Sequence, residues 1–209
     1  MKDKILAIGN YKDAPYHPFG GVDECLKEIF QEMELVCTDD PQLFLTLKKG
    51  EYKAVISYLD IWNSTLSEEE SEALYSYVVS GGALLILHNG ISIQSSKKLE
   101  CIMGGKFLSH PAMEEIRFEM KPHAITEGCC SFSLLEEPYQ FEMTEDKKEV
   151  FLVYLYKGKE YIGGWSKETG DGRLVFLTPG HTKDAFKNAE YIKLIKNSMK
   201  WCRKEVTER

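Results

Sequence analysis

The stretch that decides the fold is SEEESEALYSYVVSGGALLILH, residues 67–88. Its first half predicts a helix, because Ser67 and Glu70 match a capping box and a pair of glycines follows at 81–82. Its second half is an apolar run that predicts a buried strand ending at His88. A helix that leads through glycines into a buried strand is the repeating unit of an α/β sheet.

The same alternation continues on both sides of this stretch. Short apolar runs predict strands at residues 4–9, 34–38, 54–59, 83–88 and 173–178. Apolar residues at helical spacing predict helices at about residues 21–33, 67–80 and 184–202. Because parallel strands are joined by right-handed crossovers, these elements predict one mainly parallel, doubly wound sheet.

Residues 114–165 interrupt the alternation. The runs EEIRFEM, PYQFEM, EVFLVYLY and EYIGGW are typical of strands, and no strong helical pattern separates them. We therefore expect an irregular, strand-rich insertion, or an antiparallel edge built onto the parallel sheet. No repeat or low-complexity linker divides the sequence, which predicts a single domain over residues 1–209.

Composition excludes several classes of function. The formal net charge of −7 argues against a nucleic-acid partner, which would require a basic face. No apolar stretch reaches the ~18 residues that a membrane-spanning helix needs, and the first ten residues lack the pattern of a signal peptide. The six cysteines form no CxxC pair, which favours reduced thiols. We expect a cytoplasmic protein with no membrane partner.

Polar residues gather at the predicted carboxyl ends of the strands, where open α/β sheets bind ligands. His17 follows the first strand, Asp60 ends the third, His88 ends the fourth and His181 follows the last. The other two histidines of the chain, His110 and His123, also lie in predicted loops. A single loop histidine is more often a surface residue than a catalyst, whereas several at one edge indicate a site.

Six short motifs follow one another along residues 16–186: YHPFG, GGALLILHNG, GGKFLSHP, HAITEG, EEPY and GDGRLVFLTPGHTKDAF. Together they resemble the ThuA-like (trehalose-utilisation) family. Each motif is weak alone, but six in the family's order are specific. The resemblance implies the flavodoxin-like three-layer α/β sandwich of class I glutamine amidotransferases, which agrees with the strand and helix pattern.

The resemblance places His88 at the elbow that carries the nucleophilic cysteine in those amidotransferases, and it places His181 at the position of their catalytic histidine. None of the six cysteines lies at such an elbow, so no thiolate is available to form an acyl-enzyme from glutamine. We therefore expect no amidotransferase activity. The tight turn of the elbow is expected at Asn89–Gly90, because glycine tolerates positive φ. Backbone N–H groups at the start of the next helix are expected to keep the His88 imidazole neutral.

An acid–base set remains at the predicted site. Histidine, with an ordinary pKa of ~6.5, transfers protons at neutral pH. The family's Asp-Glu-x-Tyr pattern falls on Glu136, Glu137 and Tyr139, and the first position departs from the pattern, which makes Glu137 the stronger candidate. We expect His88, His181 and Glu137 to be catalytic.

The expected substrate-binding residues surround this set. They are His17, Asn89, His110, Tyr139, Asp60 and Trp62. Aromatic rings stack on the apolar face of a pyranose, while polar groups bind its hydroxyls, so Tyr11 and Tyr16 also suit a sugar. For Tyr11 and Trp62 the alternative is ordinary packing. For Asp60 and His123 the alternative is a structural role in a turn.

The resemblance implies carbohydrate catabolism, of trehalose and related disaccharides through keto-sugars. A keto-sugar has acidic protons beside its carbonyl, so a histidine–glutamate pair could catalyse isomerisation, elimination or hydrolysis. No GxGxxG fingerprint follows the first strand, and no cofactor is expected. Two alternatives stay open: a non-catalytic sugar-binding or regulatory module, and a metal-dependent hydrolase or isomerase that holds an ion such as zinc. Assembly into a homo-oligomer is also a possibility that the sequence leaves open.

Overall fold

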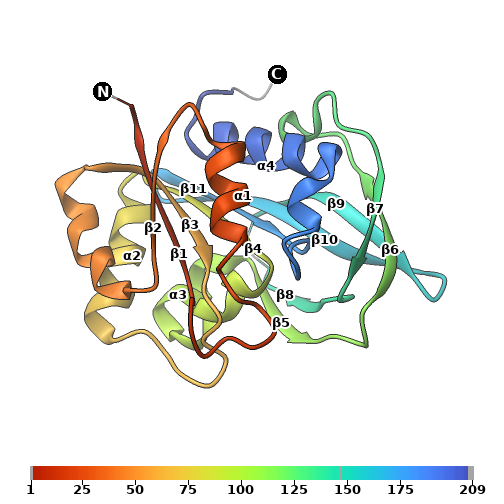
Figure 1. Cartoon of the computed structure of the whole chain (residues 1–209), viewed down its shortest axis with the longest axis horizontal. Coiled ribbons are helices and arrows are strands. Elements are labelled where there is room, and N and C mark those ends of the chain that lie inside the picture. Colours follow the sequence, from red (N-terminus) through yellow and green to blue (C-terminus); the bar gives the residue numbers. More distant parts are fainter. Residues whose placement is uncertain (1, 146, 207–209) are drawn as a thin grey trace.

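A nine-stranded mixed sheet organises the chain (Figure 1). The computed structural model describes residues 2–145 and 147–206. The strand order is β2-β1-β3-β4-β11-β10-β9-β6-β7. The first five of these are parallel: β2 (Glu34–Thr38), β1 (Lys4–Gly9), β3 (Tyr52–Tyr58), β4 (Ala83–Leu87) and β11 (Gly172–Leu177). They confirm the predicted parallel strands to within two residues.

The rest of the sheet is an antiparallel extension. Its strands are β10 (Lys159–Thr169), β9 (Glu149–Tyr156), β6 (Glu114–Met120) and β7 (Phe132–Glu136). The expected strand-rich insertion is therefore an antiparallel edge that continues the main sheet. A separate two-stranded sheet pairs β5 (Gly105–Ser109) with β8 (Gln140–Met143).

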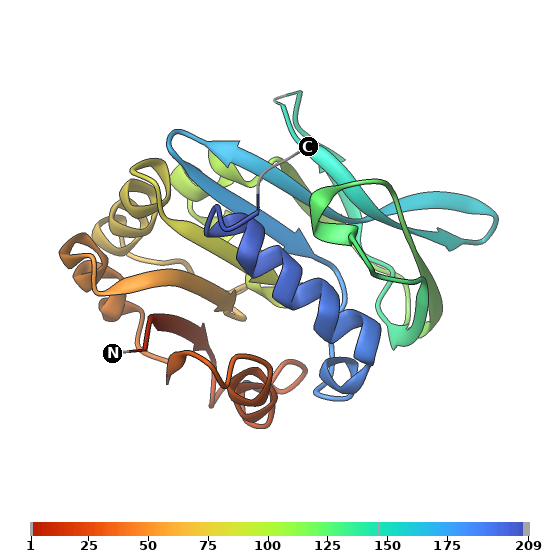
Figure 2. The same ribbon diagram turned by 90° about the horizontal axis from the view of Figure 1, so that it is seen from above.

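Helices cover both faces of the sheet (Figure 2). On one face lie α1 (Val22–Ile29) and α4 (Ala189–Cys202), which pack on Ile5 and Leu85. On the other lie α2 (Glu68–Val79) and α3 (Lys97–Met103), packed on Leu6 and Leu84. Neighbouring residues of one strand thus enter different cores, as the period of two in a strand requires. The result is the predicted three-layer α/β sandwich.

Local signals explain most of the helix boundaries. The capping box of α2 is present, since the Ser67 side chain accepts from the Glu70 N–H and the Glu70 side chain accepts from the Ser67 N–H. The short 3₁₀ segments were not predicted: η1 (Pro41–Lys49), η2 (His88–Ser95), η3 (Ala124–Thr126) and η4 (Ala185–Lys187). Because of η4, the last α-helix starts at Ala189 rather than at 184.

The helices can be compared with the length and apolar character of membrane-spanning segments. Within residues 2–145 and 147–206, none of them combines the length and the apolar character that crossing a bilayer demands.

Candidate functional site

The elbow after β4 is built by the backbone of His88 itself. His88 has a φ of 46°, a left-handed conformation that is rare for a residue with a side chain. The expectation that Gly90 supplies the positive φ is wrong, because Gly90 is not among the described residues with positive φ. Gly90 is needed for another reason: a Cβ there would lie 2.0 Å from the Ser57 carbonyl oxygen of β3. The chain can turn close against β3 only because this position has no side chain.

The His88 imidazole is completely buried and has one defined tautomer. Its Nδ1 lies 2.6 Å from the Thr178 carbonyl oxygen. A carbonyl only accepts, so Nδ1 donates and Nε2 carries the lone pair. Within the described part of the chain, Nε2 makes no hydrogen bond. Burial lowers the pKa of His88 to about 4, although Glu137 opposes this, so the ring is neutral at pH 7. A neutral ring was expected, but burial rather than the start of a helix is the cause.

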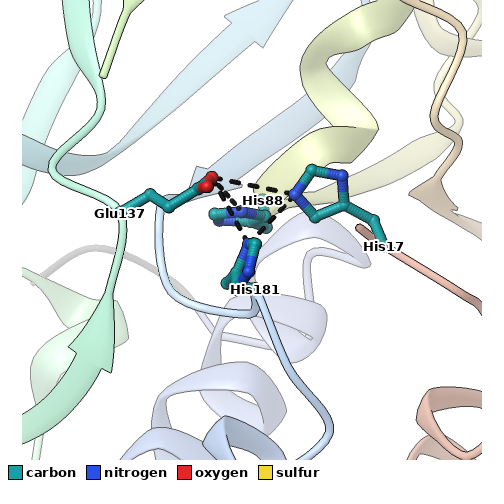
Figure 3. A group of neighbouring side chains, drawn as sticks. All are labelled: His17, His88, Glu137 and His181. Atoms are coloured by element: carbon teal, nitrogen blue, oxygen red, sulfur yellow. Dashed lines mark hydrogen bonds and ion pairs between the residues drawn. The ribbon is translucent and has the colours of Figure 1, made fainter. Parts of the chain in front are cut away.

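Three imidazoles surround one carboxylate at this elbow (Figure 3). The Glu137 Oε2 atom lies 3.3 Å from His181 Nδ1, 3.4 Å from His88 Nε2 and 3.7 Å from His17 Nε2. His181 Nδ1 and His17 Nε2 are 3.1 Å apart. These side chains follow β1, β4, β7 and β11, so the topology gathers residues from the whole chain. We refer to His17, His88, Glu137 and His181 as the His₃Glu cluster.

Asp60 fixes the tautomer of His17. The Asp60 Oδ2 atom lies 2.9 Å from His17 Nδ1, and the Asp60 N–H donates to the Asn10 side chain at 2.7 Å. Because a carboxylate only accepts, Nδ1 donates and Nε2 faces the cluster. Burial lowers the pKa of His17, but the hydrogen bonds to Asp60 and Glu137 outweigh it and the net shift is upward.

The two neighbouring glutamates occupy different environments. The Glu136 side chain is fully buried, and burial raises its pKa to about 8. It accepts hydrogen bonds from the N–H groups of Gly180 at 2.7 Å and His181 at 3.2 Å. Burial also acts to raise the pKa of Glu137, but its imidazole partners hold that pKa far below the usual range. Glu136 therefore anchors the loop that carries His181, while Glu137 faces the imidazoles.

A pocket of about 860 Å³ opens beside the cluster. Its walls combine aromatic and polar side chains, including Tyr16, Trp62, Phe107, Tyr139, Asn63, Ser64 and His110. From the cluster, His17 and Glu137 line it, whereas His88 and His181 do not. This volume lies within the range of roughly 300–1,000 Å³ that is typical of small-molecule sites.

Most of the expected substrate-binding residues border this pocket. His17, Asp60, Trp62, His110 and Tyr139 are among its lining residues. Tyr139 also stacks on the His88 ring, with the ring centroids 4.4 Å apart. His110 is partly exposed, and its Nδ1 lies 2.9 Å from the Pro111 carbonyl oxygen.

Three other candidates lie away from the pocket lining. Asn89 is buried and donates to the Tyr58 carbonyl, so it supports the elbow. Tyr11 donates to Asp23. His123 accepts from the Ile125 N–H and so fixes a turn, which was one of its expected roles.

Sequence reasoning missed other contributors. Phe107 and Asn10 line the pocket, and Phe107 lies within the GGKFLSHP motif, which could have indicated it. The Thr178 carbonyl that orients His88 is a backbone group and leaves no signal in the sequence.

Comparisons with known proteins agree with this architecture. The profile of the family described as ThuA, trehalose utilisation, matches residues 21–202. A comparison with curated proteins gives no match. The fold is similar to that of a putative thua-like protein from Parabacteroides merdae, with a TM-score of 0.81, 16% identity and coverage of 100% of this chain and 93% of the other.

Two further solved structures share the fold. A putative thua-like protein from Bacteroides uniformis has a TM-score of 0.75 and 18% identity, over 96% of this chain and 91% of the other. A GH42 beta-galactosidase from G. stearothermophilus has a TM-score of 0.61 and 12% identity, over 90% of this chain but 29% of the other. At these identities the likeness concerns the fold.

Proposed function

The chain belongs to the ThuA (trehalose utilisation) family, and on that premise we propose that it is an enzyme acting on a disaccharide or keto-sugar by acid–base chemistry. The observation that carries the proposal is the pocket, in which aromatic walls meet the imidazole and carboxylate groups of the cluster. Rings and hydrogen-bonding groups on one cavity wall suit the two faces of a pyranose.

The reaction class follows from the chemistry of a keto-sugar. Removing the proton on the carbon beside the carbonyl leaves an electron pair that moves onto the carbonyl oxygen and forms an enediolate. The pair can then return and expel a leaving group one carbon further, such as the glycosidic oxygen, which leaves with the proton that was removed; this is an elimination. Alternatively, the hydroxyl proton of the carbon that lost its hydrogen passes to the former carbonyl oxygen and the removed proton is returned to the former carbonyl carbon, which is an isomerisation. Neither route consumes an oxidant or a reductant.

In this proposal the His₃Glu cluster stabilises the negative oxygen of the enediolate. His17 and Glu137 border the pocket, so the sugar meets them first. His88 and His181 do not line the pocket and act through their contacts with the Glu137 carboxylate, at 3.4 and 3.3 Å. A hydrogen-bond donor held in place before the reaction is worth most in a buried site, because nothing has to reorganise when the oxyanion forms.

Proton transfer is best assigned to His110. The side chain borders the pocket and is 37% exposed. Its Nδ1 donates to the Pro111 carbonyl, so Nε2 keeps the lone pair that can accept a proton. This gives His110 a catalytic role in addition to the binding role expected from the sequence.

The test is hydrogen exchange and turnover of a 3-keto disaccharide, such as 3-keto-trehalose, in D₂O followed by NMR. The wild-type protein should exchange the proton beside the carbonyl, or eliminate or isomerise the sugar. His110→Ala should lower the rate by about 10²–10⁴-fold, the usual loss for a general base. Tyr11→Phe, outside the pocket lining, is the matched control. Sugar binding with no exchange or turnover would reject the enzyme and favour a sugar-binding module.

A further inference from the structure

We infer that the His₃Glu cluster is a binding site for one divalent transition-metal cation. The ligands are Nε2 of His17, Nε2 of His88, Nδ1 of His181 and a carboxylate oxygen of Glu137. The site itself is argued from geometry alone, and only its role toward a sugar rests on the proposed function.

The imidazoles of His88 and His17 are oriented for a cation. His88 Nδ1 donates to the Thr178 carbonyl and His17 Nδ1 donates to the Asp60 carboxylate, so in both rings Nε2 is the nitrogen that points into the cluster and is left to bind a cation. Metal-binding histidines show this arrangement, in which a carbonyl or carboxylate accepts from the nitrogen that does not bind the metal. The surroundings thus hold these two rings in the tautomer that a cation requires.

The cluster contains more hydrogen-bond acceptors than donors. Within the described residues, His88 Nε2 and Glu137 Oε2 are buried and make no hydrogen bond. His17 Nε2 and His181 Nδ1 are 3.1 Å apart, so two lone pairs face each other when both nitrogens lack a proton. One proton satisfies one pair of acceptors, whereas one cation satisfies all four at once. Buried polar atoms without partners are costly, which favours the cation.

The spacing of the four side chains also fits a bound cation. Zinc-type bonds of about 2.1 Å in a tetrahedron place the ligand atoms about 3.4 Å from one another. The measured separations are 3.1, 3.3, 3.4 and 3.7 Å, and no two of the four ligand atoms are more than 4.8 Å apart. The side chains therefore lie at the distances of a coordination shell.

The donor set defines the class of cation. Three imidazole nitrogens and one carboxylate suit zinc, manganese, iron, cobalt or nickel, while calcium and magnesium prefer oxygen ligands. Because His17 and Glu137 line the pocket, a sugar carbonyl oxygen can approach from that side. A cation here would act as a Lewis acid toward that carbonyl and its enediolate.

The test uses the whole protein and metal ions alone. Protein stripped with EDTA should take up one Zn²⁺, Mn²⁺ or Co²⁺ per chain by elemental analysis after gel filtration, and its Tm should rise. Bound Co²⁺ should give the visible absorption bands of a site with nitrogen ligands, and Mg²⁺ should leave Tm unchanged. These measurements on the wild-type protein do not depend on the folding of any variant.

Variants locate the cation. Glu137→Gln and His17→Ala, checked for folding by circular dichroism, should weaken binding at least as much as loss of an orienting partner does, which is about 10–100-fold. Asp60→Ala should weaken metal binding by about 10–100-fold and should alter the Co²⁺ spectrum. Tyr16→Phe is the matched control, since it alters a pocket residue outside the cluster and should keep the metal.

Two results would overturn the inference. One is stripped wild-type protein that takes up none of these ions. The other is uptake by Glu137→Gln and His17→Ala as tight as that of the wild-type protein. If the protein takes up no metal and converts a keto-sugar at the same rate with and without EDTA, the cation is rejected and the proposed function stands. If the protein binds one metal ion per chain but converts no sugar, the cation site is supported and the proposed function is rejected.

Discussion

At the scale of single residues, His88 combines a strained backbone with a side chain that the fold holds in place. The Thr178 carbonyl and the Tyr139 ring hold the imidazole while the backbone stays left-handed at a φ of 46°. Such conformations cost of order 1–3 kcal/mol and persist only where the surroundings enforce them. The strain therefore lies at the residue that faces the other cluster side chains.

A pair of substitutions at His88 separates this strain from the role of the imidazole. Asn tolerates the left-handed region and Val does not, so His88→Val should unfold more easily than His88→Asn by about 1–2 kcal/mol. Both variants should lose metal uptake, because both lack the imidazole. Chemical denaturation measures the difference, and equal stabilities would show that the backbone conformation carries no cost.

Gly90 allows the close approach of the elbow to β3. In Gly90→Ala the new Cβ would lie 2.0 Å from the Ser57 carbonyl oxygen, a backbone atom that cannot move aside alone. We expect a loss of about 3 kcal/mol or more in the free energy of unfolding, at the upper end for overpacking. Gly20→Ala is the control, since a Cβ there meets nothing within 4 Å. A stable Gly90→Ala protein would contradict this geometry.

At the scale of elements, the loop after β11 depends on Glu136. Removing its carboxyl leaves the N–H groups of Gly180 and His181 without their acceptor. Glu136→Ala should therefore lower stability by about 3 kcal/mol, from the cavity and the unsatisfied donors together. Glu136→Gln keeps an acceptor oxygen and should cost about 1 kcal/mol.

The same pair of variants shows whether Glu136 positions His181. Metal affinity should fall in Glu136→Ala and recover in Glu136→Gln, as expected for a residue that acts through another. If both variants bind metal as tightly as the wild type, the anchoring role is wrong. Stability is measured by chemical denaturation and affinity by titration of the stripped protein.

The elements differ in how well their sequences specify them. Buried parallel strands such as β4 are unbroken apolar runs, and α2 carries its own capping box, so both were predicted closely. By contrast, α3 has only seven residues and η2 is 3₁₀, so neither repeats a helical pattern long enough to detect. The antiparallel pairing of β6 with β9 joins segments far apart in the chain, and no local pattern encodes it.

The sequence predicted only those site residues that directly follow a predicted strand. His17, His88 and His181 were placed together because each follows a strand of the sheet, and the structure brings them within one cluster. The burial of Asn89 and the anchoring contact of Glu136 depend on which way a side chain points in an irregular turn. An irregular turn has no repeating pattern of residues from which the direction of a side chain could be predicted.

At the scale of the whole molecule, the sheet continues without a break from β2 to β7. We predict a single cooperative unfolding transition, because the antiparallel extension shares β10 with the parallel part and both cores contain residues of β11. Three tryptophans report on different regions: Trp62 on the pocket, Trp165 on β10 and Trp201 on α4.

Variants that keep one tryptophan each test this prediction. Their fluorescence transitions should coincide with one another and with circular dichroism. Separate midpoints would instead show that the extension folds as its own unit and would reject the single-domain prediction.

The position of β11 in the sheet has a consequence for how the chain is made. β11 is the last strand in sequence, yet it lies between β4 and β10. Until residues 172–177 leave the ribosome, β4 and β10 each present an unpaired strand edge to the cell. Nascent chains in this state are prone to associate with one another, so chaperones should hold them during synthesis. Closure of the sheet by β11 also brings in His181, so the His₃Glu cluster can be complete only after translation of nearly all the described chain.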